Sequence, residues 1–214
     1  MAAVLEIPVE TTTELEIALA IIPGSRRFTA QEYQQLAEIG VLGEDERVEL
    51  IEGRIVQMCA KSMNHAIATR RANRFFTKLL GDRAIVSVQD PILLNDYSEP
   101  EPDIVLVAPP EERYLDHHPT PKEVFLVLEI ADSSLAYDRD ERCPLFAQNR
   151  IVQFCLLNLK DRELEDYRDP GRSGYRSKQT YAEGQSFNLA AFPKISVKVK
   201  DLLPPVKAAK ARKT

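Results

Sequence analysis

Apolar residues recur every three or four positions through residues 63–81. The apolar positions of this segment are Ile67, Ala68, Ala72, Phe75, Phe76, Leu79 and Leu80. This spacing places the apolar side chains along one side of a helix. Gly81 follows the last of them, and glycine is typical of a helix end because it tolerates a left-handed backbone. The pattern therefore predicts an amphipathic helix over residues 63–81 that packs against a core.

Two further helices are predicted on either side of this one. Thr29 is followed three residues later by Glu32, which is the spacing of a capping box, and Gly40 closes the segment. A third helix is predicted over residues 138–149. The helices are separated by short apolar runs, which indicates that they flank a sheet.

Strands are predicted where β-branched and apolar residues cluster between turn residues. Residues 47–58 are expected to form two strands around a tight turn at Glu52–Gly53. The remaining strand-like runs are residues 84–94, 103–108, 124–130, 151–159, 163–170, 174–182 and 195–199, and the fourth and fifth of these are expected to pair as a hairpin. The mixture predicts an α/β (α+β) fold, with helices covering a mixed central sheet.

Composition narrows the class of protein. The chain has 214 residues, 44% hydrophobic and 29% charged, which suits one domain with appendages. We expect an N-terminal arm over residues 1–24, a domain over 25–203 and a basic tail over 204–214. The formal net charge of −5 gives no general attraction to nucleic acid or anionic lipid.

Cysteine usage and hydropathy bear on the compartment. The three cysteines lack CxxC spacing, which favours reduced thiols. We find neither an apolar run of membrane-spanning length nor a basic signal-peptide region. The expectation is a cytoplasmic protein with no membrane partner.

The candidate chemistry lies at the start of residues 103–108. Prolines 100 and 102 stiffen the approach to Asp103. If this strand pairs antiparallel with residues 124–130, with Ala108 opposite Val124, then Asp103 lies opposite Glu129. Opposed side chains in such a ladder have Cβ atoms about 4.5–5.5 Å apart, so two carboxylates would repel each other unless a cation lay between them.

Glu129 also interrupts an otherwise apolar run, and burying an unpaired carboxylate is costly. A hard divalent cation such as Mg²⁺ would remove both penalties, because it prefers oxygen ligands. The alternative is that both acids lie at strand ends and face water.

Four stretches together carry a family resemblance: "VELIEGRIVQM", "NHAIATRRANRFFTKLL", "SEPEPDIVLV" and the run from "VFLVLEIADSS" to "ELEDYRDP". Their order and spacing resemble the Uma-two family, restriction-endonuclease-like proteins abundant in cyanobacteria, within the PD-(D/E)xK nuclease superfamily. The resemblance covers residues 28–170, with a looser continuation to about 203. It implies a restriction-endonuclease-like fold and an endonuclease that uses Mg²⁺, or Mn²⁺, to hydrolyse DNA phosphodiester bonds.

The resemblance also assigns roles to individual residues. It makes Asp103 and Glu129 the two metal-binding acids, and the backbone carbonyl of Ile130 is expected to be a third ligand. Glu49 matches a glutamate on the first strand that helps to hold metal or water, and Glu52 is a competing candidate. His65 matches a position where the family often has histidine, although a histidine near a helix start also serves as a capping or packing residue.

The chain departs from the family pattern at the lysine. The superfamily places lysine two residues beyond the second acid, where this chain has Ala131. In the Uma-two family the lysine usually lies in the following helix, at the position of Arg142 here. Arginine stays charged and cannot act as a base, but it can stabilise negative charge on a phosphate. The alternative is a surface arginine on an exposed helix face.

One row of basic residues is a candidate DNA contact. Arg70, Arg74 and Lys78 follow each other at four-residue spacing on the helix of residues 63–81, with Arg71 beside them. Such a row can bind phosphates, and His65 is a further candidate contact, whereas a solvated helix face is the ordinary alternative. A homodimer would suit cutting of both strands by two-fold symmetry.

Other reaction classes lack support in the sequence. His117 and His118 have no third ligand at zinc-site spacing, and Ser133 and Ser134 lack the GxSxG context of a serine hydrolase. There is no glycine-rich phosphate loop. The leading hypothesis is a Mg²⁺-dependent endonuclease with Asp103, Glu129, Arg142 and Glu49 in its catalytic centre. The alternative is a catalytically impaired module of nuclease fold that binds nucleic acid or a protein partner.

Overall fold

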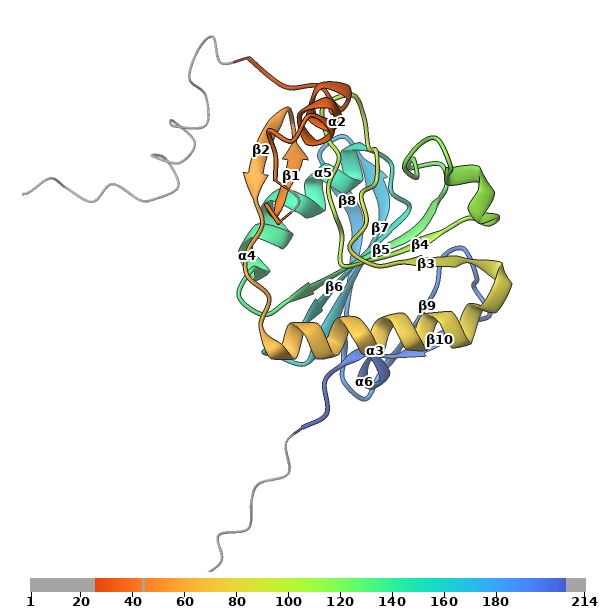
Figure 1. Ribbon diagram of the computed structural model, residues 1–214. Helices are drawn as coiled ribbons and strands as arrows, with labels where there is room; N and C mark the ends of the chain where they lie inside the picture. Colours follow the sequence, from red (N-terminus) through yellow and green to blue (C-terminus); the bar gives the residue numbers. More distant parts are fainter. Residues whose placement is uncertain (1–25, 44, 207–214) are drawn as a thin grey trace, which may run out of the picture.

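A six-stranded sheet forms the centre of the fold in the computed structural model, which describes residues 26–43 and 45–206 (Figure 1). The strands lie in the order β3 (Ile85–Ser87), β4 (Ile104–Val107), β5 (Val124–Ala131), β6 (Gln153–Asn158), β7 (Glu163–Gly171) and β8 (Gly174–Ala182). Neighbouring strands are antiparallel except for the parallel pair β5–β6. The predicted mixed sheet flanked by helices is therefore confirmed.

Helices and two small hairpins surround the sheet. The hairpins are β1 (Val48–Ile51) with β2 (Arg54–Gln57), and β9 (Ser186–Asn188) with β10 (Ser196–Lys198). The α-helices are α2 (Ala30–Glu38), α3 (Met63–Leu80), α4 (Leu135–Tyr137), α5 (Cys143–Gln148) and α6 (Val199–Leu202). Single turns of 3₁₀-helix cover Gly81–Arg83 and Glu111–Tyr114, and a π-helical turn covers Asp138–Arg142. No helix in the described part of the chain is both long and apolar enough to cross a membrane.

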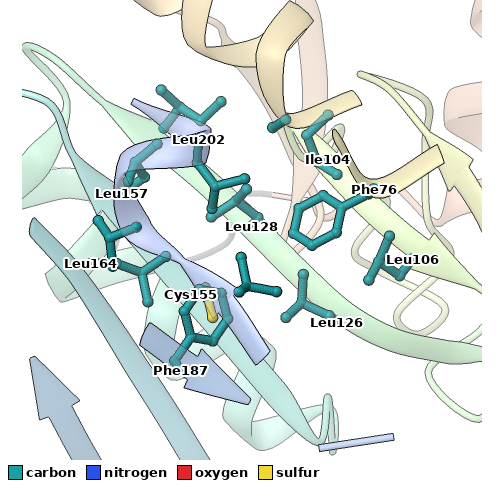
Figure 2. Packing of buried hydrophobic residues seen from close by; sticks show 14 of the residues in the cluster. Phe76, Ile104, Leu106, Leu126, Leu128, Cys155, Leu157, Leu164, Phe187 and Leu202 are labelled. Atoms are coloured by element: carbon teal, nitrogen blue, oxygen red, sulfur yellow. The ribbon is translucent and has the colours of Figure 1, made fainter. Parts of the chain in front are cut away.

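Helix α3 covers one face of the sheet, with α6 beside it (Figure 1). Its predicted apolar stripe is confirmed, because Ala68, Ala72 and Phe76 are fully buried. Figure 2 shows Phe76 packed against the alternate side chains of β4 and β5 that point to this face, among them Ile104 and Leu128. This core fixes the height of α3 above the sheet and so fixes where the first turn of α3 lies.

The opposite face is covered by the segment from α4 to α5. Val105 and Val127 point to this side, where they pack with Phe146 of α5 and Phe154 of β6. Strand residues alternate between faces. Asp103 and Glu129 differ from Val105 and Val127 by two positions, so they share this second face.

The β1–β2 hairpin depends on a turn that only glycine suits. Gly53 has φ +79°, and a Cβ atom there would lie 2.5 Å from Cβ of Arg27. Its carbonyl accepts from the N–H of Phe28, and its own N–H donates to the carbonyl of Tyr97. The predicted turn at Glu52–Gly53 is confirmed, and these contacts hold the hairpin, and with it Glu49, over the edge of the sheet.

Two predicted elements differ from the structure. Only Ile85–Ser87 of the strand expected over 84–94 pairs with the sheet, because Pro91 has no N–H and Gln89 adopts φ +59°. The helix expected over 138–149 instead begins at Leu135 and passes through the π-helical turn before α5.

Other predicted elements are confirmed. Helix α2 begins with the capping box of Thr29 and Glu32. The strands β6 and β7 pair as the expected hairpin, whereas β9 and α6 were not predicted. The arm expected over 1–24 and residues 207–214 of the expected tail lie outside the described residues.

Candidate active site

The register of β4 and β5 brings the two candidate metal-binding acids together. Ile104 pairs with Leu128, and continuing this register by one residue places Asp103 opposite Glu129, as predicted. The backbone N–H of Asp103 donates to Oε2 of Glu129 at 3.3 Å. In turn the backbone N–H of Ile130 donates to Oδ2 of Asp103 at 2.9 Å. Each acid is therefore held by the strand that carries the other.

The predicted register is wrong at the other end of this strand pair. Val124 pairs with Val107 rather than Ala108, because the register shifts between Leu106 and Val107. A β-bulge of this kind inserts one extra residue into one strand. The shift lies beyond the site and leaves the pairing of its two acids unchanged.

His65 and Gln89 complete the surroundings of Asp103. His65 lies in the first turn of α3, whose N-cap is Ser62, and its Nε2 lies 2.9 Å from Oδ2 of Asp103. Gln89 Nε2 donates to Oδ1 at 3.0 Å. Burial alone would raise the pKa of Asp103, but His65 and the N–H of Ile130 outweigh it and hold the pKa below its ordinary value. Asp103 is therefore kept as a carboxylate.

Arg142 links the second acid to the β1–β2 hairpin. Its Nε donates to Oε1 of Glu129 at 2.8 Å, and its Nη1 lies 2.5 and 2.7 Å from the two carboxylate oxygens of Glu49. The guanidinium also lies over the ring of Phe146, 5.6 Å from its centroid. Arg142 is only 5% exposed, so the alternative of a surface arginine is wrong.

Glu49, and not Glu52, reaches the site. Glu49 is 2% exposed and also accepts the backbone N–H of Glu101 at 3.1 Å. Glu52 lies in the hairpin turn and is exposed. Glu52, at the turn after β1, is therefore not among the residues that contact Arg142.

These groups line a cavity of about 330 Å³ in which carboxylates outnumber cations. Among the described residues, its acidic side chains are Glu49, Glu101, Asp103, Glu129, Asp132 and Asp138, and its arginine and lysine side chains are Arg47, Lys61 and Arg142. Burial, and then the neighbouring acids, raise the pKa of Glu129 well above its ordinary value despite Arg142. The pKa of Asp138 is also raised, chiefly by burial. With all of these carboxyl groups ionised, the cavity would hold more negative charge than its protein cations balance, and the raised pKa values show the cost of that charge.

The donor set fits a hard divalent cation. Carboxylate oxygens are the ligands that Mg²⁺ and Mn²⁺ prefer, and one carboxylate can accept about four bonds. From the described residues, Asp103 Oδ1 accepts a hydrogen bond from Gln89, and Glu129 Oε2 accepts the long bond from the N–H of Asp103. Each of these two oxygens therefore keeps an acceptor direction. Across residues 26–43 and 45–206, no group of three or more His, Cys, Asp or Glu side chains is arranged around one ion position.

The basic row on α3 lies away from this cavity. Arg70, Arg74 and Lys78 are exposed. Arg74 and Lys78 line a separate groove with Asp201 of α6, and Arg71 donates to the carbonyl of Lys200. The basic residues of α3 therefore lie near one another but do not line the cavity that contains Asp103 and Glu129.

Gln89 and Lys61 are among the residues at the site that sequence reasoning missed. Gln89 belongs to a segment that was expected to be a strand, and Lys61 precedes α3 in a segment without regular structure. Neither residue lies in a motif that could have identified it.

Comparison with known proteins bears on the identity of the chain. The model of the Uma2 family, described as "Putative restriction endonuclease", matches residues 30–200. No curated protein matches the chain. A crystal structure from Anabaena variabilis ATCC 29413, described as a "putative nuclease belonging to DUF820", is similar with a TM-score of 0.62 at 18% sequence identity. The similarity covers 78% of this chain and 96% of that chain, and it shows a shared fold.

Proposed function

The chain belongs to the Uma2 family, and from this membership we propose that it is a nuclease that hydrolyses DNA phosphodiester bonds with a divalent cation. The observation that carries the proposal is the convergence of Asp103 and Glu129 in a cavity with excess negative charge. Such a cavity would repel a phosphate unless a cation were bound first. The expected cation is Mg²⁺ or Mn²⁺.

The chain's own residues have distinct roles in this proposal. Asp103 and Glu129 would hold the cation, with the carbonyl of Ile130 as a further expected ligand. His65 and Gln89 orient Asp103 through its two oxygens. A bound divalent cation would supply Lewis-acid polarisation of a phosphoryl oxygen.

Arg142 positions the acids in this proposal. Its guanidinium faces Glu129 and Glu49, so it fixes the rotamers of both carboxylates. Because arginine keeps its proton, it cannot accept one from an attacking water. Burial would lower the pKa of Arg142, but the charges of Glu129 and Glu49 raise it above its ordinary value.

Plasmid nicking tests the proposal. Supercoiled plasmid is incubated with the wild type, Asp103→Asn and Asp116→Asn, in Mg²⁺ or Mn²⁺ and in EDTA. Asp116 is the matched control, because its side chain is 87% exposed in a loop. We expect metal-dependent nicking by the wild type and by Asp116→Asn, and none by Asp103→Asn. Equal nicking by Asp103→Asn would exclude Asp103 from the centre.

Metal binding gives a readout independent of cleavage. A ligand that binds the folded state alone at about one hundred times its Kd stabilises it by about 2.7 kcal/mol. Mg²⁺ or Mn²⁺ should therefore raise the Tm of the wild type and of Asp116→Asn, but not that of Asp103→Asn. A Tm rise of equal size in all three proteins would place the cation elsewhere.

A second candidate is a module that binds DNA without cutting it. The observation in its favour is that Arg142, at the family's lysine position, is committed to two carboxylates. DNA binding that persists in EDTA, with no nicking in any metal, would support this candidate. New nicking activity in Arg142→Lys would show that the arginine impairs catalysis.

A further inference from the structure

Lys61 lies in the cavity on a segment that is anchored at both ends. The segment connects β2 to α3 and has no regular secondary structure. On one side of Lys61, Nη1 of Arg47 donates to the carbonyl of Cys59 at 3.3 Å. On the other side, the hydroxyl of Ser62 donates to Oδ2 of Asp132 at 2.5 Å, and it also caps α3. The position of Lys61 at the wall of the cavity is therefore set by contacts to Arg47, just before β1, and to Asp132, just after β5.

The other two cations of the cavity have protein partners. Arg142 is bonded to Glu49 and Glu129, and Arg47 is bonded to the backbone carbonyl of Cys59. Lys61, by contrast, makes no hydrogen bond or ion pair with any described residue. Its ammonium group therefore keeps three hydrogen-bond donors for a ligand.

The surroundings of Lys61 suit an anion that enters beside the two acids. Its side chain is half-buried, and burial, followed by the charge of Arg47, lowers its pKa. Asp103, Glu101 and Glu129 line the same cavity, and their charges act in the opposite direction on the pKa of Lys61. An incoming phosphate would meet this unpartnered ammonium and would at the same time meet repulsion from the acids.

We propose that Lys61 binds the scissile phosphate of DNA in this cavity and supplies there the lysine that position 142 lacks. The inference rests on the proposed function, because it requires DNA as the substrate. A lysine ammonium is a compact charge on a flexible stem, and it binds phosphate through three rotatable donors. Lys61 comes to the site from the segment before α3, whereas Arg142 comes from the π-helical turn before α5.

Nicking by lysine variants is the first test. Lys61→Met removes the charge and keeps the length, Lys61→Arg keeps the charge, and Lys122→Met is the matched control. Lys122 is exposed just before β5, whose other end carries Glu129. We expect Lys61→Met to slow nicking by about 10²–10³-fold, as for loss of one donor to developing negative charge. Lys61→Arg should recover part of the rate, and Lys122→Met should match the wild type.

Protection of the amine by DNA separates binding from folding. Wild-type protein is reductively methylated with formaldehyde and a borohydride reagent, with and without a short DNA duplex in Ca²⁺. Methylation at Lys61 and at Lys122 is then quantified by peptide mass spectrometry. The duplex should slow methylation of Lys61 several-fold and leave Lys122 unchanged, and Lys61→Met should keep the Tm of the wild type. A purely structural lysine would give a lower Tm and no protection.

The outcomes distinguish this inference from the proposed function. If the wild type nicks or binds DNA while Lys61 is unprotected and Lys61→Met is fully active, the role of Lys61 is refuted and the nuclease stands. If the wild type binds DNA without nicking, protection of Lys61 still supports the phosphate contact. If the wild type neither nicks nor binds DNA, both proposals fall together.

Discussion

Replacing Arg142 with methionine tests whether this side chain neutralises the buried acids. Arg142, Glu49 and Glu129 are 5%, 2% and 4% exposed, so water cannot take over the role of the guanidinium. Methionine fills much of the same volume but leaves both carboxylates without a cation. Breaking a buried ion pair by removing one partner costs about 3–5 kcal/mol. For a chain of this size, such a loss lowers Tm by roughly 6–20 °C.

Urea unfolding followed by circular dichroism measures this loss. The series is the wild type, Arg142→Met, Arg142→Lys and the double variant Arg142→Met/Glu49→Gln. Arg172→Met is the control, because Arg172 is exposed at the β7–β8 turn. Arg142→Lys should lose less than Arg142→Met, because lysine keeps the charge but cannot bond both acids through a planar fork.

The double variant decides the cause of the destabilisation. If the loss comes from orphaned negative charge, then neutralising Glu49 should recover about 1–3 kcal/mol, a coupling typical of residues in one network. A loss below about 1 kcal/mol in Arg142→Met would show that the acids are stabilised by other means. A double variant no more stable than Arg142→Met would show that lost packing, and not charge, is the cause.

Three further predictions concern the rest of the fold and the DNA surface. Burial would raise the pKa of Glu165, but the hydrogen bond from Arg139 and further donors hold it below its ordinary value. Its contribution to stability is therefore full above the unfolded-state pKa of about 4.3 and is lost as pH falls through the folded-state pKa. In unfolding curves, Glu165→Gln should cost about 1–3 kcal/mol at neutral pH and should flatten the fall in stability below pH of about 4. Gly53→Ala should cost about 1–3 kcal/mol in the same assay, because it strains a left-handed backbone and meets Arg27, and an unchanged midpoint would contradict this. If Arg74 and Lys78 contact phosphates, their Gln variants should each reduce the slope of log affinity against log salt by about 0.9 in a DNA-binding titration, and an unchanged slope would make the row a solvated helix face.

Local sequence patterns predicted the structure correctly where residues only a few positions apart determine it. The capping box at Thr29 and the turn at Glu52–Gly53 are set by residues a few positions apart, so no distant contact was needed to predict them. The stripe of α3 is equally local, because its period alone fixes the buried side. The pairing of Asp103 with Glu129 was predicted from an assumed register, which holds beside the site, and a bulge outside the site did not alter it.

Local sequence patterns gave wrong predictions where contacts with distant parts of the chain determine the structure. The pattern after Ser87 predicts a continuing strand, but the N–H groups of Gln89 and Ile92 donate to the carbonyls of Pro102 and Pro100, so the segment lies beside the approach to β4 without forming a regular ladder. The charged run over residues 138–142 reads as a solvated helix face. The structure buries Arg142 because Glu49, 93 positions earlier, lies over it, and no local pattern encodes such a contact.

The same reasoning applies to the residue that the family motif lacks in this chain. A motif fixes a residue's position along the chain, whereas phosphate binding requires a charge at a place in the cavity. Arg142 keeps the motif position but directs its donors at two carboxylates, and Lys61, outside every motif, leaves its donors free of the described residues. Because the cavity is assembled from β1, β2, the segments before α3 and before β4, β5 and the π-helical turn, a lysine from any of these could serve. If Lys61 binds phosphate as proposed, an arginine at position 142 does not by itself decide between the nuclease and the module that binds DNA without cutting it, and the Lys61 variants separate the two.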